Sequence, residues 1–214
     1  LPADFKHSLL EVRDEVKKKR VIVIAGERGL CGAYNSNLIK KVIADECNCP
    51  DNISRDFVPV GRRAVSAAKS NEWEVAGSYE GLAEDANLWP ISEIVNSAIE
   101  DFEAGLCDEV VVYYTTFVSA LTQEVTKEVL LPLAGSEEGK TENKNFPGHV
   151  KYDPSAEEIA ANVLPLLART KLLQAGLESK ASEHAARMTA MDSATNNADD
   201  LIQSLRLYYN RARQ

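Results

Sequence analysis

Apolar residues along this chain follow two different periods, which divide it into two parts. In the first part, short runs of β-branched and apolar residues alternate with segments in which apolar residues recur every three or four positions. Runs of the first kind are typical of strands buried on both faces of a parallel sheet, and segments of the second kind are typical of amphipathic helices. This alternation predicts an α/β domain with a mostly parallel sheet of about five strands.

The predicted elements place a Rossmann-like domain at residues 20–134, preceded by a linker at 1–19. Strands are expected at 20–25, 56–60, 72–77, 109–115 and 122–131, and helices at 35–46, 62–70 and 92–105. The segment 135–154 is polar and rich in Gly, Glu and Lys, so we expect it to be an exposed loop that ends the domain.

The second part of the chain, 155–214, predicts one long helix. From Leu177 to Gln214 it contains neither glycine nor proline. Certain positions there recur at alternating steps of three and four: Ala181, His184, Met188, Met191, Thr195, Ala198, Ile202, Leu205, Tyr209 and Ala212. This 3.5-residue repeat is the period of a left-handed coiled coil, so we interpret the row as a coiled-coil seam.

The predicted seam needs a partner helix. A helix over 177–214 is roughly 55 Å long at 1.5 Å per residue, which exceeds the width of so small a domain, so most of it must project. An amphipathic helix that lies on the sheet would be shorter. No other segment of the sequence is long enough to pair with it, and we expect the partner to be another chain or a segment outside this sequence.

Charge narrows the classes of partner. The formal net charge of −9 argues against general nucleic-acid binding, which requires a basic face. No acidic residue follows Asp200, whereas Arg206, Arg211 and Arg213 do, so the C-terminal tip is basic and suits an acidic protein partner. No apolar stretch approaches the roughly 20 residues that span a bilayer, so no membrane span is expected.

The cysteines predict neither a disulfide framework nor a metal centre. Cys31, Cys47, Cys49 and Cys107 are few and scattered, and we expect free thiols. Cys47 and Cys49 resemble half of a metal site, but no other His or Cys pair stands at a spacing that would complete it.

A glycine-containing turn follows the first predicted strand and precedes a helix, which is a place where backbone N–H groups can hold phosphate. The turn reads Gly26-Glu27-Arg28-Gly29-Leu30-Cys31-Gly32 and lacks the Gly-x-Gly start of the dinucleotide fingerprint, and no acidic residue ends the second strand. Arg62 and Arg63 could instead meet a 2′-phosphate, which leaves a dinucleotide open. Our preferred interpretation is structural: Gly29 and Gly32 permit a tight turn, and Cys31 packs as a small apolar residue.

Several segments resemble the gamma subunit family of F-type ATP synthases. Gly26 to Asn37 is similar to that family's Asp-Arg-Gly-Leu-Cys-Gly-Gly-Phe/Tyr-Asn motif, with Glu27 in place of the aspartate, and 60–63 and 114–119 resemble its Gly-Arg-Lys and Tyr-Thr-x-Phe-x-Ser segments. The most specific similarity lies in 181–191, 194–198 and 209–214, which match the family's C-terminal helix almost residue by residue.

The resemblance implies a non-catalytic rotor subunit that needs no cofactor. Members of the family couple rotation to ATP synthesis on the beta subunits, contact the alpha and beta subunits through an antiparallel coiled coil, and bind the epsilon subunit and the membrane rotor ring through the α/β domain. The expected location is peripheral to the energy-transducing membrane, on the cytoplasmic side in a bacterium or the matrix or stroma side in an organelle. The resemblance also places Arg211, Arg213 and Gln214 near a beta-subunit loop.

Two departures from the family pattern concern the ends. The family's long N-terminal helix, the natural partner of the predicted seam, is absent, and its C-terminal helix continues beyond the Arg-Gln that ends this sequence. We therefore expect both ends of the shaft to lie outside this chain. Two alternatives remain at this point: a Rossmann-like nucleotide-binding enzyme with an appended helix, and a coiled-coil scaffold unrelated to ATP synthase.

Overall fold

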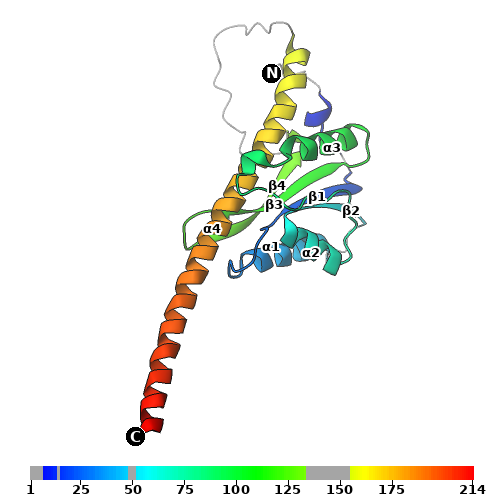
Figure 1. The fold of residues 1–214 in the computed structure, drawn as a ribbon. Coiled ribbons are helices and arrows are strands. Elements are labelled where there is room, and N and C mark those ends of the chain that lie inside the picture. Colours follow the sequence, from blue (N-terminus) through cyan, green and yellow to red (C-terminus); the bar gives the residue numbers. More distant parts are fainter. Residues whose placement is uncertain (1–6, 14, 48–51, 134–154) are drawn as a thin grey trace.

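Four strands form one sheet in the computed structural model, which describes residues 7–13, 15–47, 52–133 and 155–214 (Figure 1). The sheet has the order β2-β1-β3-β4, with β1 and β2 parallel, β1 and β3 parallel, and β3 and β4 antiparallel. The strands are β1 (Lys18–Ile24), β2 (Ser54–Val60), β3 (Glu109–Phe117) and β4 (Gln123–Leu131). The expected α/β architecture with a mostly parallel sheet is therefore confirmed, with one antiparallel strand at its edge.

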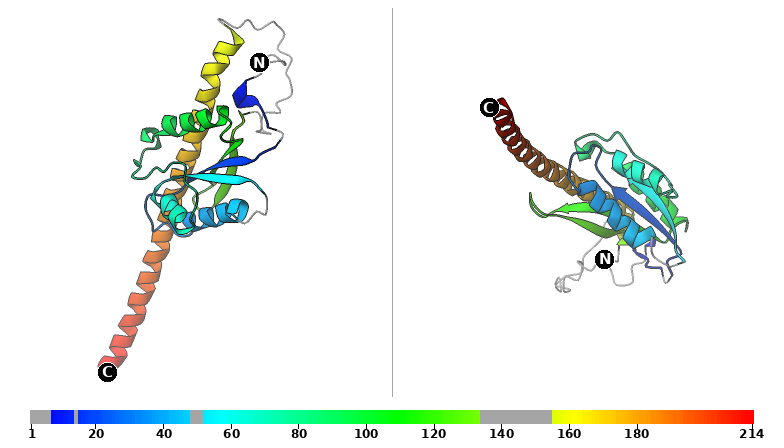
Figure 2. Two further views of the ribbon diagram at one scale, coloured as in Figure 1. Left: turned by 90° about the vertical axis from the view of Figure 1, so that its right-hand side faces the viewer. Right: turned by 90° about the horizontal axis from the view of Figure 1, so that it is seen from below.

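Helices cover both faces of this sheet (Figure 2). The helix α1 (Tyr34–Val42), which continues into the π-helical turn η2 (Ile43–Cys47), and α2 (Arg62–Ser70) lie on one face, while α3 (Ile91–Glu103) and α4 (Ala156–Arg213) lie on the other. Two short 3-10 turns, η1 (Ser8–Leu10) and η3 (Ala86–Leu88), pack on the α3 and α4 side.

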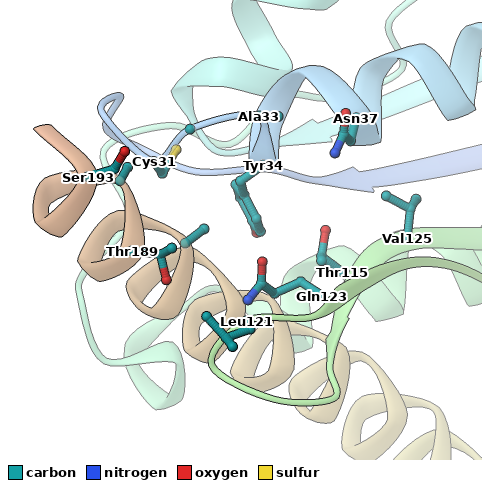
Figure 3. Close-up of a pocket in the computed structure, with 13 residues that line it drawn as sticks. Cys31, Ala33, Tyr34, Asn37, Thr115, Leu121, Gln123, Val125, Thr189 and Ser193 are labelled. Carbon is teal, nitrogen blue, oxygen red and sulfur yellow. The ribbon is translucent and has the colours of Figure 1, made fainter. Parts of the chain in front are cut away.

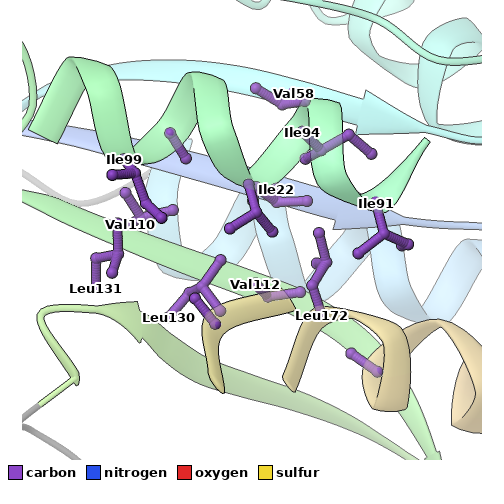
Figure 4. Close-up of a cluster of buried hydrophobic side chains, with 14 of the residues drawn as sticks. Ile22, Val58, Ile91, Ile94, Ile99, Val110, Val112, Leu130, Leu131 and Leu172 are labelled. Atoms are coloured by element: carbon purple, nitrogen blue, oxygen red, sulfur yellow. The ribbon is translucent and has the colours of Figure 1, made fainter. Parts of the chain in front are cut away.

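The two sides of the core follow the alternation of side chains along each strand. Ile22, Val110 and Val112 point toward α3 and α4, where Leu172 of α4 meets them (Figure 4). Their neighbours in sequence point the other way and pack against α1 and α2, among them Val21, Val23, Val111 and Tyr113. In keeping with this cover on both faces, β1 and β3 contain uninterrupted runs of apolar and aromatic residues, 21–24 and 110–114.

The predicted strand at 72–77 is not a strand of the sheet. Val75 and Tyr79 form only isolated bridges to Phe57 and Val60, along the outer edge of β2. A regular ladder cannot form along this edge because Pro59 has no N–H to donate to it. The Pro59 carbonyl still accepts a hydrogen bond from the Tyr79 N–H at 3.0 Å. The sheet therefore has four strands rather than about five.

The helix α4 is 58 residues long, or about 87 Å at 1.5 Å per residue. It begins after Ser155, whose hydroxyl accepts from the Glu158 N–H at 3.2 Å. Its first half lies along the domain and its second half projects away from it (Figure 1). The predicted loop 135–154 and residues 1–6 of the predicted linker lie outside the described residues. In the described part of the linker, Leu9 is buried.

Candidate functional site

The predicted coiled-coil seam lies on an exposed face of α4. The exposed fraction of its larger side chains is 55% for Met188, 40% for Met191, 46% for Ile202, 56% for Leu205 and 65% for Tyr209. Thr195 and Ala198 are exposed as well. Among the described residues, Glu84 reaches the start of this row, with its Oε2 at 3.6 Å from His184 Nε2, whereas every seam residue from Met188 onward is exposed.

Further apolar side chains are exposed nearer the start of α4 than the sequence pattern indicated. Val163, Leu166, Leu167 and Leu177 are all between 43% and 58% exposed. Leu177 lies one step of four before Ala181, whereas Val163, Leu166 and Leu167 form a separate group ten or more residues further toward the N-terminus. Pro165 and Gly176 lie within this part of the continuous helix α4, and the repeat recognised in the sequence begins only after them.

The basic tip is fully formed as a helix end. Arg211, Arg213 and Gln214 are exposed, and the Gln214 N–H donates to the Asn210 carbonyl at 3.3 Å. Among the described residues, no ion pair involves Arg211 or Arg213, and both side chains are exposed to solvent.

The glycine-containing turn connects β1 to α1 and is held by a side chain of the helix. The Asn35 amide oxygen accepts from the Gly26 N–H at 2.9 Å, and its nitrogen donates to Cys31 Sγ at 3.0 Å. Gly32 adopts a φ of 56°, which favours glycine. Cys31 is buried, and this burial raises the pKa of its thiol.

The two arginines that could have met a phosphate lie against the turn instead. Arg62 Nε is 3.8 Å from Glu27 Oε2, and the Arg63 side chain covers Gly29 so closely that a Cβ there would lie 2.5 Å from Arg63 Nη2. Because Nη2 is the far end of a flexible side chain that can shift, this contact does not by itself require glycine at position 29. No group of three or more His, Cys, Asp or Glu side chains within the described ranges could hold a metal ion.

A cavity of about 280 Å³ opens beside the turn, where α1, β3 and α4 meet (Figure 3). Tyr34, Asn37, Thr115 and Gln123 point toward it, and Leu121 lies at its rim. None of its lining residues is charged. The Thr115 hydroxyl is buried without a hydrogen-bond partner, so the cavity carries polar groups but no constellation for catalysis.

Polar side chains attach α4 to the domain next to this cavity. The Ser182 hydroxyl donates to the Thr115 carbonyl at 3.0 Å, and the Tyr34 hydroxyl donates to the Ser179 carbonyl at 3.0 Å. Glu183 is also buried, and Arg187 Nη2 lies 2.5 Å from its Oε1. Sequence analysis missed this attachment, because a polar residue beside an apolar seam is ordinarily solvated.

Comparison with known proteins extends over nearly the whole chain. The family model described as ATP synthase matches residues 2–214. The ATP synthase gamma chain of Heliobacterium modesticaldum is 40% identical over 216 residues, which cover 99% of this chain and 73% of that protein. The gamma chain of Exiguobacterium sibiricum is 40% identical over 208 residues, which cover 97% of this chain and 71% of that protein.

Solved structures share the fold at lower identity. The central stalk and c-ring structure of the Tetrahymena thermophila mitochondrial ATP synthase contains a chain with a TM-score of 0.67 at 23% identity, covering 86% of this chain and 79% of that chain. A chain of the Euglena gracilis mitochondrial ATP synthase rotor has a TM-score of 0.65 at 18% identity, covering 100% and 79%. The similarity in sequence, which extends through the exposed helix and the glycine-containing turn alike, places this chain in the ATP synthase gamma chain family.

Proposed function

We propose that this chain is the central rotor shaft of a rotary ATP synthase and couples rotation to ATP synthesis on the beta subunits. The observation that carries the proposal is the exposed row on α4 in a member of the gamma chain family. Apolar side chains such as Ile202, Leu205 and Tyr209 are left in water along a projecting helix, which is costly unless another surface covers them. The chain is a subunit of an enzyme complex and is not itself catalytic.

The projecting half of α4 and the α/β domain suit different tasks in such a rotor. The projecting half would pair with an antiparallel helix through the seam at Met188, Met191, Thr195, Ala198, Ile202, Leu205 and Tyr209 and turn inside the ring of alpha and beta subunits. The α/β domain would carry the epsilon subunit and rest on the membrane rotor ring, and the whole would lie at the periphery of the membrane. No helix among the described residues is both long and apolar enough to cross a membrane.

Rotation of the assembled complex tests the proposal directly. Ser66 is exposed on α2, a helix on the face of the sheet opposite to α4, and Ser66→Cys in a Cys47→Ser, Cys49→Ser background gives a site for a visible probe. In an alpha–beta complex fixed to a surface, ATP should drive continuous rotation of the probe in one direction. ATP hydrolysis without rotation of the probe would refute the proposed shaft.

The basic tip is proposed to contact carboxylates of the beta subunit through Arg211, Arg213 and Gln214. Arg213→Glu would then place like charges opposite each other and lower coupled ATP hydrolysis in the assembled complex. Lys69→Glu, at an exposed position of α2, is the matched charge-reversal control and should leave hydrolysis unchanged. Equal hydrolysis and coupling in the two variants would mean that the tip arginines only solvate the helix end.

The proposed contact with epsilon can be measured on its own. Purified epsilon should bind this chain in solution, and substitutions in the exposed seam, such as Leu205→Glu, should leave that binding intact because the seam lies outside the α/β domain. Failure of epsilon to bind the folded chain would refute the proposal that the α/β domain binds epsilon.

A further inference from the structure

The helix α4 changes from a supported to an unsupported helix within about two turns. Ala185 is its last buried residue, with 7% of its surface exposed, and every residue from Met191 onward is exposed. The stretch from Met191 to Arg213 projects by about 35 Å at 1.5 Å per residue. A lateral or twisting load on this projecting lever is therefore carried by the last contacts that α4 makes with the domain.

These last contacts differ in kind from the earlier ones. Further toward its N-terminus α4 packs on the sheet through apolar side chains, in the order Ala160, Leu164, Ala168, Leu172 and Ala175. In the turn before Ala185 the buried residues are polar: Ser179, Lys180, Ser182 and Glu183, with 2%, 8%, 0% and 3% of their surfaces exposed. We call these four residues the polar joint. After Ala185, among the described residues, only the exposed Thr189 adds a further hydrogen bond to the domain, from its hydroxyl to the Ala120 carbonyl at 3.3 Å.

The polar joint is bonded to the ends of two strands and to α1. The Ser182 hydroxyl donates to the carbonyl of Thr115 in β3, and the Ser179 hydroxyl lies 3.4 Å from the Ile24 carbonyl at the end of β1. The Tyr34 hydroxyl, at the start of α1, lies 2.8 Å from Ser179 Oγ and donates to the Ser179 carbonyl. Three elements of the domain, β1, β3 and α1, are thus hydrogen-bonded to one turn of α4.

Glu183 adds a charged contact at the same level. Its carboxylate rests against Gly26, where an added Cβ would lie 3.0 Å from Glu183 Oε1. It is held there by Arg187 and by Lys180, whose Nζ lies 3.3 Å from Glu183 Oε2 and 3.4 Å from Glu84 Oε2. Lys180 thereby also ties α4 to the segment before η3.

Burying four polar side chains costs free energy that apolar residues of the same size would not cost. Apolar contacts, however, are non-directional and allow a helix to slide or turn about its axis, whereas hydrogen bonds fix both its register and its rotation. We infer that the polar joint is the torque-bearing connection of the rotor, in which Ser179, Ser182 and Glu183 act as positioning residues that lock α4 to the sheet. This inference rests on the proposed rotor function.

The test removes hydroxyl groups without creating a large cavity. The double variant Tyr34→Phe, Ser182→Ala eliminates the bonds to Ser179 and Thr115, and Ser70→Ala, on exposed α2, is the matched control. In the isolated chain, amide hydrogen exchange over 179–190 should become about tenfold faster in the double variant, since each lost bond weakens local protection. The control should exchange like the wild type.

The decisive readout is coupling in the assembled enzyme in membrane vesicles. The number of protons pumped per ATP hydrolysed should fall by about half or more in the double variant, while ATP hydrolysis changes less than about twofold, because a slipping shaft still permits turnover. Unchanged coupling alongside faster exchange would overturn the inference, since the joint would then be structural only. If the wild-type complex itself fails to couple, the proposed function fails instead.

Discussion

Removal of the buried Glu46 carboxylate should destabilise the α/β domain strongly. Glu46 lies in the π-helical turn η2 and is 2% exposed. Its Oε1 accepts from Lys127 Nζ at 2.6 Å and from the Tyr113 hydroxyl at 2.7 Å, and its Oε2 accepts from Arg55 Nε at 2.9 Å. Lys19 Nζ also lies 3.8 Å from Oε2, so Glu46→Ala leaves a buried tyrosine hydroxyl and three basic side chains without their shared partner.

The size of this effect follows from how far each partner is buried. Breaking a fully buried ion pair costs about 3–5 kcal/mol. The side chain of Arg55 is 10% exposed, but that of Lys127 is 35% exposed and can regain water. We therefore expect the lower end, about 3 kcal/mol, which corresponds to a fall in Tm of roughly 6–12 °C for a chain of this size.

The pH dependence of stability gives a second, independent signature. Burial alone would raise the pKa of Glu46, but hydrogen bonds from Lys127, Arg55 and Tyr113 outweigh it and lower the pKa below the ordinary value of 4.5. A carboxyl group whose pKa is lower in the folded state stabilises the protein above its unfolded pKa. That stabilisation is lost as the pH falls from about 4.5 through the folded pKa.

Urea denaturation at pH 7 and at several values below 4.5 measures both effects. Glu46→Gln should be less stable than the wild type at pH 7, and the difference should shrink as the pH falls through the window below 4.5. Glu124→Gln, an exposed glutamate on β4, should lie within about 0.5 kcal/mol of the wild type throughout. A loss below 1 kcal/mol for Glu46→Ala at pH 7 would refute the argument that this carboxylate holds η2 to β3 and β4.

Three further predictions concern the turn, the seam and the thiols. Gly61→Ala should lower the free energy of unfolding in urea by several kcal/mol, because Gly61 has a φ of 96° and an added Cβ would lie 2.2 Å from the Ala25 carbonyl oxygen. The control Gly81→Ala, at a φ of 72° with open space around it, should lower it by less. Leu205→Glu should leave the Tm of the isolated chain within about 2 °C while preventing assembly with alpha and beta subunits in gel filtration, and normal assembly would contradict the seam. In a Cys49→Ser background, exposed Cys47 should react with a thiol reagent before buried Cys31 and Cys107, and burial raises the pKa of Cys107 to about 11. Mass spectrometry gives the order of labelling, and labelling of Cys107 first would contradict this prediction.

Features that depend on neighbouring residues along the chain could be predicted from the sequence. The continuous apolar runs within β1 and β3 identify strands covered on both faces, and α2 has the bounds that the sequence predicts for it, 62–70. The repeat from Met188 to Tyr209 indicates a helix with an unpaired seam, and the motifs around Cys31 and at 181–191 identify the family. Each of these signals is local, so one sequence is enough to carry it.

Features that depend on distant residues were decided only by the tertiary structure. Glu46 looks like a solvated acid at the end of a helix, yet it is buried because Lys127, 81 residues away, and Tyr113 meet it across the sheet. Ser179 and Ser182 flank the exposed row in sequence, but the sheet lies on their side of the helix and buries them. A periodic pattern marks where apolar side chains fall, whereas the burial of a polar side chain depends on a partner that only the folded chain brings within reach.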